Sequence, residues 1–216
     1  LVSFAQSIWE ANCTVEGVMA EKAENLQDVQ HILRSKKIPV LIDPKGLFIH
    51  ELKPKAVIDA IIAKKNLGTS IDMAPIVIGL GPGFEAGKDA HAIIETNRGH
   101  QLGKVIFDGF AEKNTNTPGS IDGFTNERLL RSPKAGLVKL DKDIGDIVKK
   151  GEAVATIGNQ KVKANIPGVI RGLIADESMV KKDFKIGDID PRGNTEYCHS
   201  ISDKARAIAG GVLEAL

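Results

Sequence analysis

The chain has 216 residues, of which 42% are hydrophobic and 26% charged, as in folded globular proteins and unlike disordered ones. Its 29 basic and 28 acidic residues leave no charged field to attract nucleic acid, and no apolar run approaches the roughly 20 residues that span a bilayer. Two cysteines, Cys13 and Cys198, are too few for a secreted disulfide scaffold, and residues 1–9 lack a secretory signal pattern. We therefore expect a cytoplasmic protein with neither nucleic-acid nor membrane partners.

Apolar periodicity predicts alternating helices and strands in the first half of the chain. Helical stripes begin the sequence and continue over 26–33, and the branched run 38–42 predicts a strand buried on both faces of a parallel sheet. A helix is expected to begin at Pro54 and to end within 64–68, and a second buried strand follows at 76–78. The apolar face of that expected helix is formed by Val57, Ile58, Ile61 and Ile62.

The second buried strand leads into a glycine-rich segment, Gly79–Gly87. Further strands are expected at 90–96 and 104–107, and the polar segment 112–124 predicts a long loop before a domain boundary near Arg131. This order predicts the α/β class, with a Rossmann-like doubly wound α/β domain over residues 1–130.

The last third of the chain contains an internal repeat with a spacing of 32 to 34 residues. Residues 132–138 are similar to 166–170, and 148–151 to 180–183, which predicts two short β-halves that interlock. Over 132–190 the pattern resembles the barrel-sandwich hybrid fold of biotinyl and lipoyl carrier domains. We expect this small all-β domain over 131–192, and over 193–216 a C-terminal helix, capped by Ser202, that packs on the first domain.

The glycine-rich segment is the first candidate site, because glycines after a strand let backbone N–H groups approach a phosphate. Its spacing is not the dinucleotide fingerprint, and Pro82 removes one N–H group, so a purely structural turn and a phosphate or cofactor cradle both stay open. Charge-assisted contacts from nearby cations would complete a cradle. The candidate cofactor-binding residues are Gly79, Gly81, Gly83, Gly87, Lys88, Arg98 and His100.

Directly after this segment, His91 and Glu95 fall on one side of the expected strand and are candidates for an acid–base pair. Two alternatives stay open: exposed strand residues without catalysis, or ligands of a divalent metal together with His100. No paired cysteines and no metal-binding histidine spacing support the metal, so no metal ligand is assigned.

Cys198 lies beside Tyr197 and His199 at the end of a polar loop, where it is either a reactive thiolate or a buried inert cysteine. A carrier role requires a lysine at the tip of the expected hairpin between the β-halves. Counting eight residues back from Pro167, as the biotinyl pattern requires, gives Asn159 and not lysine. The nearby lysines, Lys161 and Lys163, are out of place for that modification.

Several uncommon strings occur in a characteristic order at residues 2–5, 39–44, 59–66, 79–87, 91–103, 185–193 and 196–198. In these strings the chain resembles the YqeB-like family of accessory proteins of the selenium-dependent molybdenum hydroxylase system. The resemblance implies a factor that matures or inserts a selenium-bearing molybdenum cofactor, with a molybdopterin-type cofactor or a nucleotide as ligand and the hydroxylase or its other maturation factors as partners. It also implies a first βα unit with a Gly-x-Gly-Asp loop, before the point at which this chain begins.

Two further hypotheses compete with this maturation factor. In one, the protein is an enzyme that transfers sulfur or selenium through Cys198, with His91 and Glu95 handling protons. In the other, it is a covalent carrier modified at Lys161 or Lys163. Whether the chain forms a homo-oligomer is left open by the sequence.

Overall fold

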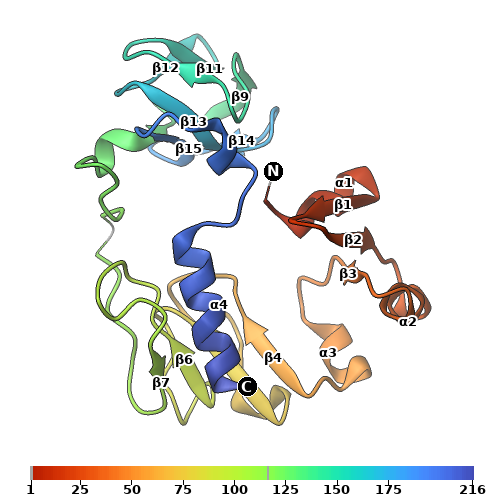
Figure 1. The fold of residues 1–216 in the computed structure, drawn as a ribbon. Coiled ribbons are helices and arrows are strands. Elements are labelled where there is room, and N and C mark those ends of the chain that lie inside the picture. Colours follow the sequence, from red (N-terminus) through yellow and green to blue (C-terminus); the bar gives the residue numbers. More distant parts are fainter. Residues whose placement is uncertain (1, 116) are drawn as a thin grey trace. The chain divides into compact units, whose positions relative to one another are not determined.

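A computed structural model describes residues 2–115 and 117–216, which form two compact units. Among the described residues, the α/β unit contains Ser3–Thr115 together with Ile201–Leu216, and the β unit contains Val2 and Thr117–Ser200. The chain therefore leaves the α/β unit, completes the β unit, and returns to the α/β unit for its last helix (Figure 1).

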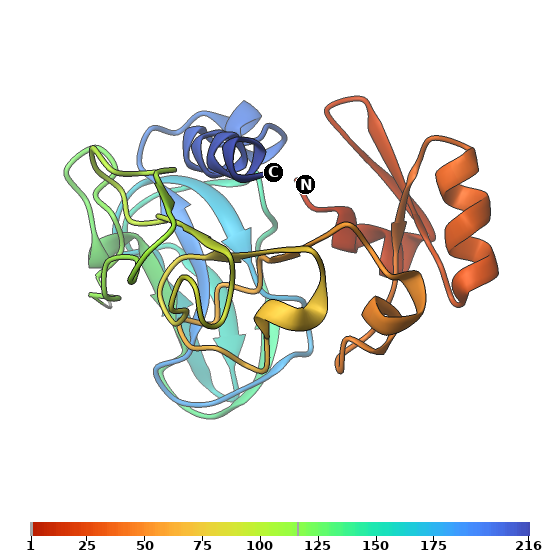
Figure 2. The same ribbon diagram turned by 90° about the horizontal axis from the view of Figure 1, so that it is seen from below.

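A small three-stranded sheet begins the α/β unit. Its strands β1 (Asn12–Val15), β2 (Val18–Lys22) and β3 (Ile38–Val40) pair in the order β1-β2-β3, with β3 parallel to β2. Figure 2 shows helix α2 (Leu26–Arg34) beside this sheet, where its buried face packs with Ala23 and Leu41. The short helices η1 (Phe4–Gln6) and α1 (Ser7–Glu10) precede β1.

The expected burial of the strand at 38–42 is wrong. The strand β3 is shorter than expected, and Ile38 is 40% exposed because β3 is the edge of the small sheet. It does not join the strand at 76–78. The hairpin of β1 and β2, which the sequence analysis did not predict, turns at Glu16-Gly17, where both residues have positive φ, 46° and 84°.

A second sheet has the order β4-β5-β6-β7. Its strands are β4 (Ala56–Asp59), β5 (Ile76–Leu80), β6 (Ala92–Ile94) and β7 (Val105–Ile106), the first three parallel and the last antiparallel. Helix α3 (Leu47–Leu52) precedes β4, and η2 (Ile71–Met73) precedes β5. The strands expected at 90–96 and 104–107 are thus present, but shorter.

The predicted C-terminal helix is present as α4 (Asp203–Ala215), and the Ser202 hydroxyl caps it by accepting the Ala205 N–H at 3.1 Å. Ile208 on α4 packs against Ile78, Leu80 and Ile94 on one face of the second sheet. On the other face, Ile93 packs against Phe84, Ala86 and Ala111 from connecting segments.

The helix expected from Pro54 to 64–68 is wrong, because that segment forms β4 and a loop. Val57 and Ile58 pair with Val77 and Ile78 of β5 in a parallel ladder, which suits β-branched side chains. Ile62 and Lys64 have φ of 55° and 64°, which a right-handed helix excludes. Because the described connections 60–75 and 81–91 contain no α-helix, the architecture is a mixed α/β fold with a C-terminal helix, without the alternating helices of a doubly wound sheet.

The β unit consists of two four-stranded sheets, with the orders β10-β13-β15-β8 and β12-β11-β9-β14. The short helix η3 (Asn126–Arg128) precedes these strands, and η4 (Thr195–Cys198) follows them. The strands are β8 (Leu129–Arg131), β9 (Gly136–Leu140), β10 (Ile147–Val148), β11 (Ala153–Ile157), β12 (Gln160–Lys163), β13 (Gly168–Leu173), β14 (Met179–Val180) and β15 (Lys185–Asp190).

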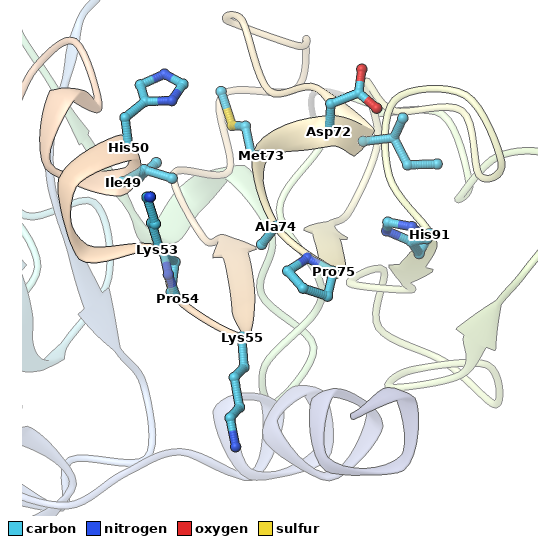
Figure 3. A pocket seen from close by; sticks show the side chains of 11 residues that line it. Ile49, His50, Lys53, Pro54, Lys55, Asp72, Met73, Ala74, Pro75 and His91 are labelled. Atoms are coloured by element: carbon cyan, nitrogen blue, oxygen red, sulfur yellow. The ribbon is translucent and has the colours of Figure 1, made fainter.

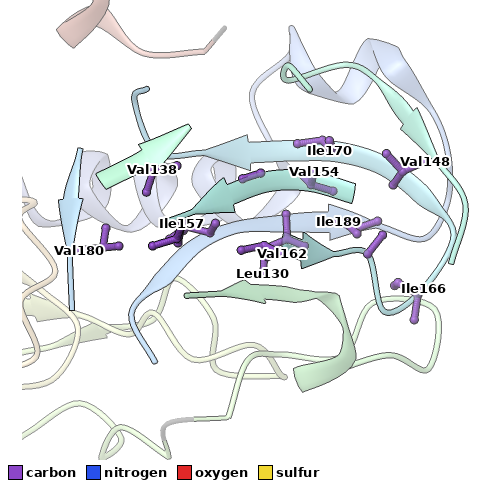
Figure 4. Close-up of a cluster of buried hydrophobic side chains, with 13 residues drawn as sticks. Leu130, Val138, Val148, Val154, Ile157, Val162, Ile166, Ile170, Val180 and Ile189 are labelled. Atoms are coloured by element: carbon purple, nitrogen blue, oxygen red, sulfur yellow. The ribbon is translucent and has the colours of Figure 1, made fainter. Parts of the chain in front are cut away.

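The two sequence halves exchange strands. The first half supplies β8 to β11 and the second β12 to β15, and each sheet contains two strands from each half. Figure 4 shows the single apolar core between them, with side chains from both halves. Neither half has a complete sheet of its own, as the repeat predicts. Among the described residues, no helix of the chain has the length and apolar character needed to cross a membrane.

Candidate functional site

The parallel strands of the second sheet end side by side, and the segments that follow them form what we call the carboxyl edge. These segments are 60–70 after β4, 81–83 after β5 and 95–104 after β6. Open α/β sheets bind ligands outside the carboxyl ends of their parallel strands. A ligand site is therefore expected at the carboxyl edge.

Three of the candidate glycines bring the chain together at this edge. A Cβ atom on Gly79 would lie 2.6 Å from the Phe84 ring, and one on Gly81, where φ is 79°, would lie 2.5 Å from the Thr96 hydroxyl oxygen. On Gly83, with φ of 114°, it would lie 2.5 Å from the Lys65 Cα. Close packing of the chain on itself thus accounts for all three glycines, as the structural-turn interpretation expects.

The other end of the glycine-rich segment lies elsewhere. The Gly87 N–H donates to the carbonyl of Ala90 at 2.8 Å, just ahead of β6. Lys88 is exposed and pairs with Glu85 at 3.0 Å, and the hydrogen bond from this pair raises the pKa of Lys88. Gly87 and Lys88 therefore precede β6, whereas the carboxyl edge follows it.

His91 and Glu95 stand at opposite ends of β6, about 13 Å apart at the rise of an extended strand. The buried Glu95 carboxylate accepts the N–H groups of Thr96, Asn97 and Glu112, each at 2.7 Å. The His91 Nδ1 accepts the Val77 N–H at 3.0 Å. The two side chains thus have separate partners, and Glu95 anchors the backbone of the carboxyl edge.

Positive side chains gather at the carboxyl edge. Arg98 forms two hydrogen bonds with the Asp203 carboxylate, at 2.7 and 3.0 Å, and thereby joins the edge to the first turn of α4. Burial lowers the pKa of Lys204, and the positive charges of Arg98 and Lys64 lower it further, against Glu95 and Asp203. His100 is exposed in the same segment. Lys64 and Lys204 were not predicted, and no local pattern could have linked residues so distant in the chain.

The loop after β4 has a strained backbone. Ile62 is β-branched and still has a positive φ of 55°. The buried Asp59 carboxylate holds the loop by accepting the Ile61 N–H at 3.0 Å and the Thr69 hydroxyl at 2.6 Å. Strained backbone held by surrounding bonds is concentrated at ligand sites and switch regions, which adds weight to the carboxyl edge.

A cavity of about 640 Å³ lies at the opposite edge of the sheet, beside the residues that enter β4, β5 and β6 (Figure 3). Because the His91 Nδ1 accepts a backbone N–H, the proton of the neutral ring is on Nε2. Figure 3 shows Lys55 extending away from the other labelled side chains. The lining residues are Ile49, His50, Lys53, Pro54, Lys55, Ile71, Asp72, Met73, Ala74, Pro75 and His91.

Cys198 is buried at the end of η4, and its thiol donates to the Ile170 carbonyl at 3.6 Å. Burial raises the pKa of this thiol, although the nearby Arg171 lowers it in part. A raised pKa disfavours the thiolate, which is the nucleophilic form. These observations favour the buried inert cysteine and weigh against transfer of sulfur or selenium through Cys198.

The hairpin between β11 and β12 turns at Gly158-Asn159, so Asn159 lies at the tip and Lys161 and Lys163 lie within β12. The tip thus carries no lysine for a covalent group. Among the described residues, no group of three or more His, Cys, Asp or Glu side chains is placed to hold a metal ion.

A comparison with known proteins supports the YqeB-like part of the resemblance seen in the sequence. The chain is 53% identical over 215 residues to the uncharacterized protein YqeB of Escherichia coli K12, and it spans 40% of that relative's length. No family model matches. A product-bound structure of the ectoine utilization protein EutE (DoeB) from Ruegeria pomeroyi matches with 16% sequence identity and a TM-score of 0.27. The match covers 38% of this chain and 27% of the EutE chain. A TM-score this low carries no argument about fold.

Proposed function

We propose that this chain belongs to an accessory or maturation factor of a selenium-dependent molybdenum hydroxylase. It binds a nucleotide-bearing or phosphate-bearing molybdenum cofactor, or the precursor of that cofactor, at the carboxyl edge. The hydroxylase, or its other maturation factors, would be the partner that receives the cofactor. The similarity to YqeB supports the choice of family. In this proposal, the second sheet is a reduced Rossmann-like layer and the β unit is a barrel-sandwich hybrid without its carrier lysine.

The observation that carries the proposal is the cluster of Lys64, Arg98 and Lys204 at the carboxyl edge. Three cations share this place with the carboxylates of Glu95 and Asp203, and Glu95 is already bonded to three N–H groups. Like charges repel one another, so an anion bound among these cations would stabilise the cluster further. A phosphate is the group that such cations bind through charge-assisted hydrogen bonds.

A calorimetric titration with ADP, as a simple phosphate-bearing probe, tests the site. We expect Lys204→Gln to weaken ADP binding about tenfold, since hydrogen bonds to charged groups contribute about 1.5–3 kcal/mol. The matched control is Lys55→Gln, which removes the same charge at the opposite edge of the sheet and should leave the affinity within about twofold. Loss of binding with Lys55→Gln alone would move the site to the cavity beside His91. Absence of any binding of ADP or pyrophosphate to the parent protein would overturn the phosphate site.

Native mass spectrometry tests the cofactor. The full-length protein, purified from cells supplied with selenium, should carry an adduct of nucleotide or molybdopterin size that is lost on denaturation. A mass increment that survives denaturation would instead favour a covalent role for Cys198, Lys161 or Lys163. A bare protein in both spectra would contradict cofactor binding.

A further inference from the structure

A second group of cations lies in the β unit, on the outer face of the sheet β10-β13-β15-β8. The carboxylate of Asp190, at the end of β15, is completely buried and is the centre of this group. Arg192 binds it through its backbone N–H at 3.1 Å, Nε at 2.9 Å and Nη2 at 2.6 Å. Arg171 on β13 binds the same carboxylate through Nη1 at 3.0 Å. Two guanidinium groups therefore share one negative charge.

A tyrosine orients both arginines. The guanidinium carbon of Arg192 lies 4.5 Å from the centre of the Tyr197 ring, and that of Arg171 lies 5.9 Å from it. Arginine stacks on aromatic faces through its planar cation, and stacking restricts the directions of the remaining N–H groups. The two side chains still reach solvent, with 21% of Arg171 and 39% of Arg192 exposed.

A third arginine extends the positive face. Arg128 is only 7% exposed and contacts Asp188 at 3.4 Å and the Gly119 carbonyl at 3.1 Å. Its Nε is buried and has no hydrogen-bond partner among the described residues. Lys185 also pairs with Asp188, at 3.1 Å. Asp188 and Asp190 lie two residues apart on β15 and so share a face, where four cations now meet two carboxylates.

A network that served stability alone would not need this excess. One arginine binds Asp190 with both ends of its fork, so the carboxylate is satisfied before the second guanidinium is added. Arg171, which is 21% exposed, adds a second positive charge to a carboxylate that Arg192 already binds. A buried donor without a partner on the same face likewise needs an acceptor.

We propose that Arg171 and Arg192, held by Asp190 and stacked on Tyr197, form a binding site for a small oxyanion, with a phosphoryl group as the preferred ligand. Planar guanidinium forks match the oxygens of phosphate and carboxylate groups, and a phosphoryl group offers more oxygen acceptors to two such forks than a carboxylate does. This site belongs to the β unit, and it stands on observations independent of the carboxyl edge.

Arginine side-chain NMR on the intact protein tests the proposal without any substitution. Inorganic phosphate, added at constant ionic strength, should produce saturable shifts of the Nε–H signals of Arg171 and Arg192. Acetate in a parallel titration distinguishes the sources of the oxyanion, and it should bind more weakly than phosphate. Shifts no larger than those caused by sodium chloride of equal ionic strength would overturn the site.

Substitutions then locate the binding. We expect Arg171→Gln to weaken phosphate binding at least tenfold and Arg171→Lys, which keeps the charge but loses the fork, to weaken it less. Lys161→Gln, on the other sheet of the same unit, is the matched control and should leave the affinity unchanged. If Arg171→Gln fails to fold, the comparison of Arg171→Lys with Lys161→Gln decides. Equal phosphate affinity in a folded Arg171→Gln protein and its parent would refute the proposal, whatever Lys204→Gln does at the carboxyl edge.

Discussion

The two units bury their apolar side chains in different ways. In the β unit, thirteen described residues form one continuous core between two sheets. In the α/β unit, the buried apolar residues include three separate clusters of four, four and three described residues. Because a continuous core links every strand around it, we expect the β unit to unfold as one body and the α/β unit to open locally.

The two units also differ in where their buried carboxylates lie. Asp190 and its arginines lie outside the core of the β unit, on the far side of a strand. Asp59, the last residue of β4, and Glu95, directly after β6, are instead buried in the α/β unit, where each holds backbone N–H or hydroxyl groups of the adjoining loops. The continuous core thus makes a rigid support for a site on its surface, whereas the divided core leaves a sheet edge whose loops are held by carboxylates.

The largest expected effect is a cavity in the continuous core. Ile170→Ala removes a fully buried side chain of the β unit and should cost about 3–4 kcal/mol of unfolding free energy. Ile208→Ala, on α4 in a cluster of four residues, should cost about 2 kcal/mol, because the side chain keeps 8% of its surface exposed and its site can collapse. Urea unfolding with hydrogen exchange of each unit measures both costs. A larger cost for Ile208→Ala would reverse the comparison.

Two neighbouring glycines of α4 test how closely this helix lies on its sheet. A Cβ on Gly211 would lie 2.1 Å from the Gly103 carbonyl oxygen, so Gly211→Ala should displace α4 and cost about 1–3 kcal/mol. Nothing lies within 4 Å of a Cβ on Gly210, so Gly210→Ala should stabilise the helix by up to about 1 kcal/mol. Thermal unfolding of the two variants should therefore shift in opposite directions, and shifts of the same sign would contradict the packing.

Glu95→Gln tests the anchoring role of the buried carboxylate. An amide nitrogen cannot accept an N–H group, so one end of the side chain would face a donor without an acceptor. We expect a loss of about 1–3 kcal/mol and faster amide exchange at Thr96, Asn97 and Glu112, with β-unit amides unaffected. Unchanged exchange at these three amides would show that Glu95 does not hold the carboxyl edge.

The smallest expected effect is the pH dependence of the stability that Asp190 gives to the β unit. Burial opposes the charge on Asp190, but the hydrogen bonds of Arg192 and the charges of both arginines outweigh it and hold the pKa below the ordinary 3.8. Asp190 therefore adds stability above pH 3.8, and this contribution is lost as the pH falls through the lower pKa of the folded state. Melting curves of the parent and of Asp190→Asn should converge as the medium is acidified. A constant difference between them would contradict the lowered pKa.

The elements that depend only on neighbouring residues were predicted from the sequence. The apolar stripe of α2, the capping by Ser202 and the glycine-rich segment after β5 are all visible in the sequence and present in the structure. The repeat predicted the paired halves of the β unit, because each strand has its counterpart about one repeat away.

Pairing with distant segments decided the rest. The apolar residues at 57–62 have helical spacing, yet Val57 and Ile58 pair with β5, and Ile61 is 68% exposed. Glu95 was a candidate for proton transfer because of its residue type, and only its three N–H partners show it to be an anchor. The C-terminal helix was expected to pack on the first domain, but no pattern of neighbouring residues places Lys204 near Lys64 and Arg98.

The order of the segments along the chain has a consequence for synthesis on the ribosome. The strands β4 to β7 emerge early, but the helix that covers Ile78, Leu80 and Ile94 follows only after the whole β unit. In that unit, β8 and β10 wait for β13 and β15 to complete their sheet. Nascent chains therefore expose apolar surface until α4 has emerged, and we expect them to depend on chaperones that bind such surfaces.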